Sequence, residues 1–228
     1  MKAYTSNNIR NIAVLGHGGK GKTTLCEAML YIAGASDRLG RVADGNTVLD
    51  FDSEEKRRKS SVSSAIAALE WDNTKLNIID APGLFDFEGG AAEAVRAAEA
   101  VLIVTSAGSG VDVGTEKAFR AAEKKGAAKF FAVTKTDSDH RNFYKTFDAL
   151  KEVYGNKLCP TIIPYMEGNI TKCYVNLMTG MAFSYDENGK ATKVPVPEDS
   201  VIEEMTSAFM EAVATCYLGV LLPRQQVR

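Results

Sequence analysis

Short apolar runs alternate with amphipathic stretches up to about residue 153. Apolar runs of this length, bounded by turn residues, predict buried strands, and the stretches between them predict helices. Strands that alternate with helices are typical of an α/β fold with a mainly parallel sheet, layered α/β/α. The expected strands are 12–15, 62–71, 75–80, 101–105 and 129–134, and the expected helices are 22–33, 90–100, 114–125 and 140–154.

One long interval interrupts this alternation. Residues 37–60 are polar, charged and glycine-containing, which predicts a long mobile loop. Within it, Glu54 with Arg58 and Glu55 with Lys59 are spaced for i,i+4 ion pairs on a short helix.

The pattern changes after Cys159, where short β-like runs surround a turn at 187–189. A helix follows from about Val201, with Ser200 and Glu203 at capping-box spacing. We therefore expect an α/β domain over residues 1–158 and a small α+β insertion, with an atypical C-terminus, over 159–228. The expected strands of the insertion are 161–164, 171–178 and 181–185, and the apolar face of its helix is Val201, Ile202, Met205 and Phe209.

Composition narrows the class of protein. Apolar residues make up 45% of the 228-residue chain, the normal share for a globular protein with a core, and the net charge is −2. Without a strongly basic arm, composition gives no sign of direct nucleic-acid binding. No apolar run approaches the roughly 20 residues that span a bilayer, and the N-terminus lacks a signal peptide. We expect a cytoplasmic monomer.

The cysteines argue against a structural zinc site. The chain has four of them and two histidines, and no two cysteines are spaced as a CxxC pair. Scattered single thiols suit a reducing compartment.

A glycine-rich motif, GxxxxGK[ST], follows the first predicted strand and opens the first predicted helix. Its residues are Gly16, His17, Gly18, Gly19, Lys20, Gly21, Lys22 and Thr23, followed by Thr24. Glycines let backbone N–H groups approach phosphates, and the helix N-terminus favours negative charge. Lys22 is expected to reach the terminal phosphates, and Thr23 offers a hydroxyl to Mg²⁺. His17 has two interpretations, a catalytic base or a residue that shapes the loop.

Two further motifs end later strands. Asp80 and Gly83 form DxxG, in which Asp80 can hold Mg²⁺ through water and the Gly83 N–H can sense a γ-phosphate. Thr134, Lys135 and Asp137 form TKxD. The Asp137 carboxylate can accept two hydrogen bonds from guanine that adenine cannot supply. DxxG and TKxD are each weak alone, but together with the phosphate loop, in this order, they predict a guanine-nucleotide site that binds GTP or GDP with Mg²⁺.

These motifs together resemble the nucleotide domain of elongation factor G, and especially its elongation factor G-like branch. GHGGKGKTTL is similar to the family's phosphate loop, DFDSEEKRRKSSVSSA to its first switch and DAPGLFDFEGG to its second. On this register Ser61 stands where the family has its Mg²⁺-binding Thr. The resemblance implies metal ligation by Thr23, Ser61 and Asp80, catalytic roles for Lys22, Gly83 and Ser61, and the ribosome as the partner of the full-length protein.

The sequence departs from that family at several positions. Leu84 stands where the family's second switch has a histidine that orients water, Thr134 replaces the Asn of NKxD, and Gly19 replaces the Asp of the main factors. The chain stops before the SA-type loop that contacts guanine. From about Thr215 the resemblance ends, and we expect a truncated, frame-shifted or mis-annotated product.

The resulting hypothesis is a GTP-binding domain that hydrolyses GTP slowly in isolation and switches conformation on the ribosome. One alternative is a ribosomal-protection factor of the tetracycline-resistance type. Another is a nucleotide-dependent binding module with little hydrolysis, which Leu84 favours. A third, an ATP-dependent P-loop kinase, lacks a visible lid and is opposed by the TKTD motif.

Overall fold

The computed structural model describes residues 2–136, 142–155, 158–168, 170–186 and 190–221, with side chains of the last helix up to residue 213. By its internal contacts the chain divides into two compact units, Met1–Thr136 and Asp137–Arg228. Each unit has its own sheet, of five strands in the first and four in the second. The domain boundary expected at residue 158 stays a prediction.

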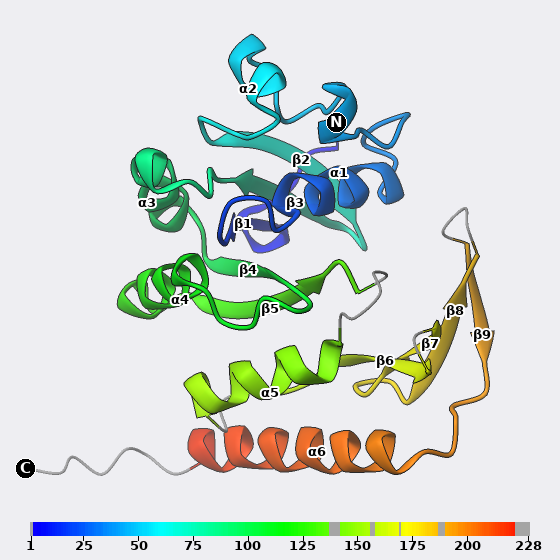
Figure 1. Ribbon diagram of the computed structural model, residues 1–228. Helices are drawn as coiled ribbons and strands as arrows, with labels where there is room; N and C mark the ends of the chain where they lie inside the picture. Colours follow the sequence, from blue (N-terminus) through cyan, green and yellow to red (C-terminus); the bar gives the residue numbers. More distant parts are fainter. Residues whose placement is uncertain (1, 137–141, 156–157, 169, 187–189, 222–228) are drawn as a thin grey trace, which may run out of the picture. The chain divides into compact units, whose positions relative to one another are not determined.

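The sheet of the first unit has the order β2-β3-β1-β4-β5 (Figure 1). Its strands are parallel except β2, which pairs antiparallel with β3. Asp72 and Asn73 join these two strands and both have positive φ, as a two-residue hairpin turn requires. The expected α/β fold with a mainly parallel sheet is confirmed. The strands are β1 (Ile9–Leu15), β2 (Ala65–Trp71), β3 (Thr74–Asp80), β4 (Ala100–Ser106) and β5 (Ala128–Thr134).

Helices cover both faces of this sheet. Alternate residues of a strand point to opposite faces, so Val14 packs in the core around α1 (Lys22–Ile32), whereas Ala13 and Leu15 pack in the core around α3 (Glu88–Ala97) and α4 (Val113–Lys125). Small side chains on α3 and α4 let these helices lie close to the strands; they include Ala94, Ala118 and Ala122, all buried, and the buried Ala98 directly follows α3.

The interval between α1 and β2 contains two short helices, η2 (Val42–Asp44) and α2 (Ser53–Arg58). Glu54 contacts Arg58 at 2.5 Å, as predicted, and Arg57 at 2.7 Å. The expected pairing of Glu55 with Lys59 is wrong. Glu55 is only 1% exposed, and its carboxylate accepts backbone N–H groups, because it completes a capping box with Asp52 at the start of α2.

The second unit combines an antiparallel sheet with α5 (Phe143–Tyr154) and α6 (Ser200–Leu221). Ile202 of α6 is buried with sheet residues, but Val201 is exposed, so the predicted apolar face is narrower by one residue. Asp199, not Ser200, accepts the N–H of Val201 and caps the helix. The strands are β6 (Ile162–Glu167), β7 (Ile170–Asn176), β8 (Met181–Tyr185) and the unpredicted β9 (Ala191–Val194).

Two other short 3₁₀ turns occur, η1 (Ser6–Asn8) and η3 (Phe85–Phe87). In the part of the chain that the structure describes, no helix is long and apolar enough to cross a membrane.

Candidate functional site

The candidate residues gather where the central strands end. Leu15, Asp80, Ser106 and Thr134 are the last residues of β1, β3, β4 and β5. Because these strands run parallel, their carboxyl ends lie at one edge of the sheet. Ligands of open α/β sheets bind at that edge, near the point where the strand order reverses.

The phosphate loop owes its shape to its glycines. Gly16, Gly19 and Gly21 have positive φ values of 139°, 73° and 87°, which other residues rarely adopt. A Cβ on Gly16 would overlap the carbonyl oxygen of Val104. Helix α1 begins at Lys22 with no side-chain cap at Gly21. The first backbone N–H groups of α1, including that of the exposed Thr24, therefore donate to no capping side chain. Such groups at a helix N-terminus can donate to a bound anion.

Lys22 turns back into this loop. It is 7% exposed, and its Nζ donates to the carbonyl oxygens of Gly16 and His17, both at 3.1 Å. Burial lowers the pKa of Lys22, and the nearby Asp80 carboxylate opposes that shift. A Cβ on Gly83 would overlap Lys22 Nζ. The loop, the lysine and the DxxG glycine therefore meet at one point, as the motifs predicted.

Two hydroxyls and two carboxylates lie beside that point. Thr23 Oγ1 donates to Asp80 Oδ2 at 2.6 Å, and Ser61 Oγ donates to Asp50 Oδ1 at 2.8 Å. Thr23 Oγ1 and Ser61 Oγ are 3.1 Å apart. This is a hydrogen-bond distance, and either hydroxyl can be the donor. The same separation is that of two neighbouring oxygen ligands of one cation.

The donor set fits Mg²⁺. Asp80 is 1% exposed, and its Oδ1 has no hydrogen-bond partner among the described residues. Burial raises the pKa of Asp80 to about 6, and the Asp50 and Glu55 charges add to the shift, whereas Thr23 and Lys22 oppose it. Mg²⁺ prefers oxygen ligands at about 2.1 Å, which places neighbouring ligands about 3.0 Å apart. The described residues contain no cluster of three or more His, Cys, Asp or Glu side chains suited to a metal, so the candidate is a hydroxyl–carboxylate site.

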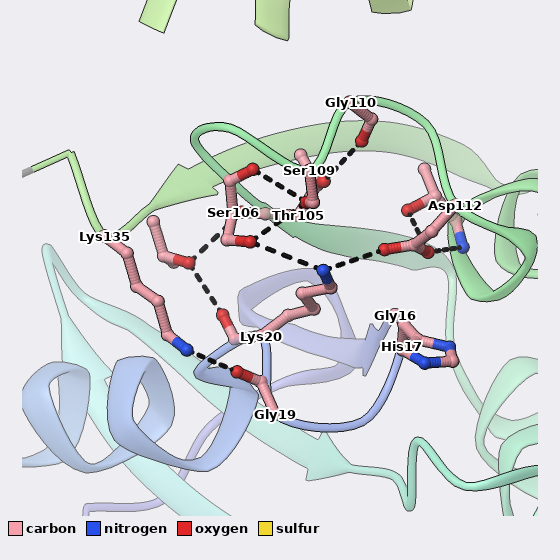
Figure 2. Close-up of polar contacts among 12 residues, drawn as sticks. Gly16, His17, Gly19, Lys20, Thr105, Ser106, Ser109, Gly110, Asp112 and Lys135 are labelled. Carbon is pink, nitrogen blue, oxygen red and sulfur yellow. Dashed lines mark hydrogen bonds and ion pairs between the residues drawn. The ribbon is translucent and has the colours of Figure 1, made fainter. Parts of the chain in front are cut away.

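The TKxD motif ties the end of β5 to the phosphate loop. Thr134 Oγ1 contacts the carbonyl oxygen of Lys20 at 2.6 Å and that of Thr105 at 3.1 Å. Lys135, itself at positive φ, donates from Nζ to the carbonyl oxygen of Gly19 at 2.6 Å (Figure 2). Thr in place of Asn therefore still supports the loop. Asp137, the residue predicted to read guanine, lies outside the described residues.

The second switch places an apolar residue over the loop. Leu84 is 39% exposed, and its Cδ2 would be 3.0 Å from a Cβ on Gly18. The His17 ring packs edge-on against Phe85, with 5.5 Å between ring centroids, and its backbone lies against Gly114 at the start of α4. These contacts favour the loop-shaping interpretation of His17.

Sequence reasoning missed residues that support the site. Glu27 is fully buried on α1, and its Oε1 accepts the N–H groups of Val48 and Leu49. Its spacing of four from Thr23 places the two on one helix face, which was the available signal. Asp50 has no such signal, because only the fold brings the loop that carries it to Ser61.

Comparison with known proteins gives consistent matches. The family model described as the elongation factor Tu GTP binding domain matches residues 7–217. An elongation factor G-like protein of Mycobacterium tuberculosis (strain CDC 1551 / Oshkosh) is 34% identical over 206 residues, which cover 90% of this chain and 28% of that protein. Elongation factor G of Mycoplasma genitalium is 30% identical over 212 residues, 91% of this chain and 31% of that protein.

A solved structure agrees with these matches. A crystal structure of a protein from Thermus thermophilus superposes with a TM-score of 0.83 at 35% identity, covering 90% of this chain and 31% of that one. The chain thus spans less than a third of the length of these relatives.

Proposed function

Because the chain belongs to the family of elongation factor Tu GTP-binding domains, within the translational GTPases that include elongation factor G, we propose that it binds Mg²⁺ with GTP or GDP, hydrolyses GTP slowly and changes shape between the two states. The observation that carries the proposal is the junction of Lys22 and Gly83 with the Thr23–Asp80–Ser61 cluster.

Each residue has a role in the proposed site. Backbone N–H groups of the phosphate loop and Lys22 hold the phosphates. Thr23, Ser61 and Asp80 hold Mg²⁺, which supplies positive charge to the phosphate oxygens when it is bound. Gly83 donates its N–H to the γ-phosphate, and Asp137 selects guanine. Water attacks the γ-phosphorus in line, the bond to the oxygen that bridges the β- and γ-phosphates breaks, and GDP leaves; the proton of the water ends on the inorganic phosphate. Lys22 and the loop N–H groups stabilise the charge that develops.

The partner of the full-length protein is proposed to be the ribosome, in the cytoplasm, because relatives that this chain matches are named elongation factor G. A ribosomal-protection factor is the alternative within the same class. A nucleotide-dependent binding module is the alternative from another class, and the apolar Leu84 over Gly18 favours it. Single-turnover hydrolysis with and without ribosomes distinguishes a switch enzyme, which ribosomes accelerate, from a binding module, which they do not.

Calorimetric titration of the nucleotide-free chain with GTP, GDP and ATP, each with Mg²⁺, tests binding directly. GTP and GDP are expected to bind well ahead of ATP, because the Asp137 carboxylate is proposed to accept the hydrogen bonds that guanine donates. Equal affinity for ATP and GTP would contradict the proposal.

Asp137→Asn exchanges a hydrogen-bond acceptor for a donor, so the nucleotide preference should move from guanine towards xanthine nucleotides. If the variant keeps full GTP affinity and gains none for xanthine nucleotides, Asp137 does not contact the base.

A further inference from the structure

Lys20 lies between two glycines of the phosphate loop. Its neighbours Gly19 and Gly21 both have positive φ, so the backbone on either side lacks the constraint that a Cβ imposes. Its side chain, only 15% exposed, reaches away from the loop to the segment that leads into α4. There Nζ lies 3.2 Å from Asp112 Oδ2 and 3.4 Å from Ser106 Oγ (Figure 2).

The side chains that contact Lys20 Nζ, Asp112 and Ser106, are themselves held by other hydrogen bonds. Asp112 caps α4, and its Oδ1 accepts the Thr115 N–H and hydroxyl, both at 2.9 Å. Ser106 ends β4, and its hydroxyl lies 3.0 Å from that of Ser109. Burial raises the pKa of Asp112, but the bonds from Thr115 and Lys20 outweigh it and leave the pKa below its ordinary value. Lys20 is therefore tied to a rigid, charged partner.

The first turn of α4 also holds the start of the loop. A Cβ on Gly114 would lie 2.6 Å from His17 Cα, so helix and loop backbones are in direct contact. The loop is thus supported at His17 by close packing and at Lys20 by an ion pair. Lys22 differs from Lys20, because its ammonium contacts the loop's own carbonyl groups and is free to turn to phosphate.

We propose that the Lys20–Asp112 ion pair holds the phosphate loop in its nucleotide-binding shape and thereby sets the rate at which the nucleotide leaves. This rests on the proposed function, since it concerns the same site. Lys20 and Asp112 are positioning residues: they act through the backbone N–H groups of the loop and do not touch phosphate. Any partner that displaces the segment before α4 would break the pair and speed nucleotide exchange.

Two single variants test this by changing the local charge in opposite directions. Lys20→Met keeps the aliphatic stem and removes a positive charge, whereas Asp112→Asn keeps the helix cap and removes a negative charge. If only the electrostatic field mattered, Asp112→Asn would bind the anionic nucleotide more tightly. If the ion pair matters, both variants release a fluorescent GDP analogue faster, by about 3- to 10-fold for a partly buried charged pair.

The controls separate the pair from general damage. Arg120→Met breaks the exposed Arg120–Glu116 pair of the same helix, 3.2 Å long, and should leave the dissociation rate unchanged. Lys20→Arg should restore slow dissociation. The double variant Lys20→Met with Asp112→Asn should dissociate no faster than the faster single variant, because one interaction is lost only once.

Each outcome of these dissociation measurements either supports or overturns the proposal. Faster release in both single variants, without additivity, supports the proposal. An unchanged or slower release from Asp112→Asn overturns it, and so do additive effects in the double variant. If the unaltered chain binds no guanine nucleotide, the proposed function fails and this inference fails with it; binding by the unaltered chain separates the two cases.

Discussion

Leu84 is the residue whose chemistry departs furthest from the function proposed for the site. It lies against Gly18 of the phosphate loop, and it has no polar atom with which to orient an attacking water. We propose that its side chain shields a γ-phosphate from solvent. The slow turnover that we propose follows from this one position.

Leu84→His should change hydrolysis by the isolated chain by less than about twofold, since a histidine there acts only when a partner positions it. The rate of both forms should stay on the scale of unassisted GTPases, about 10⁻⁴ to 10⁻³ per second, with GTP bound for minutes. Single-turnover assays with labelled GTP measure this. Turnover above about one per second, the scale of assisted enzymes, or a large loss of GTP affinity in the variant, would refute it.

Lys22→Ala should weaken GTP binding by about 1.5–3 kcal/mol, the value of a charge-assisted contact to phosphate. The melting temperature should not fall, because Nζ contacts only two carbonyl groups of its own loop and burial disfavours its charge. Titration calorimetry and thermal denaturation give the two readouts. Lys124→Ala, at an exposed position on α4, is the control. Normal GTP affinity in Lys22→Ala would exclude this lysine from the site.

At the residue scale, the sequence predicted those site residues that belong to recognisable local motifs. Lys22 and Thr23 open α1 as expected, because a strand–loop–helix motif fixes its own geometry. Asp80 reaches Thr23 because β1 and β3 are parallel neighbours whose carboxyl ends lie at the same edge of the sheet. Glu27 and Asp50 could not be found in this way, because their partners come from distant segments. The bond from Thr134 to Lys20 joins residues 114 positions apart, and no spacing rule predicts it.

At the scale of elements, the segment between α1 and β2 differs from what its sequence pattern predicted. Its spacing predicted an ion pair of Glu55 with Lys59, yet Glu55 is buried and accepts the N–H groups of Val62 and Ser63. Composition cannot distinguish a solvated carboxylate from one that accepts hydrogen bonds from the backbone N–H groups of a loop. β9 was missed for a related reason: four mostly exposed residues give no apolar signal.

Glu27→Ala should destabilise this segment and the first unit with it. The change leaves the N–H groups of Val48 and Leu49 without their acceptor and opens a void in the buried interior. The free energy of unfolding should fall by about 2–4 kcal/mol, the scale of a broken buried hydrogen-bond network. Urea denaturation measures it. Glu27→Gln keeps an acceptor oxygen and should lose less than half as much, so an equal loss in the two variants would contradict this explanation.

Among the described residues, buried hydrophobic side chains form three clusters: two in the first unit, one on each face of its sheet, and one in the second unit. The alternation of strands and helices predicted the first sheet, and the change of pattern after residue 159 predicted the second group of strands. Strand order could not be read from the sequence alone, because it depends on which pairings bury both faces. Every candidate site residue that the structure describes belongs to the first unit.

Nucleotide binding should therefore stabilise the first unit by mass action. At 100 times the dissociation constant, GDP with Mg²⁺ adds about 2.7 kcal/mol to the stability of the form that binds it. Hydrogen exchange should slow at 16–24 and 80–83 and in β1 and β3, and much less in β7, whose core is separate. EDTA should reverse the protection by removing the Mg²⁺ that Thr23 and Asp80, which lie 2.6 Å apart, are proposed to hold. Equal protection in β7 would show that both units unfold together, and protection that survives EDTA would exclude a divalent cation from the site.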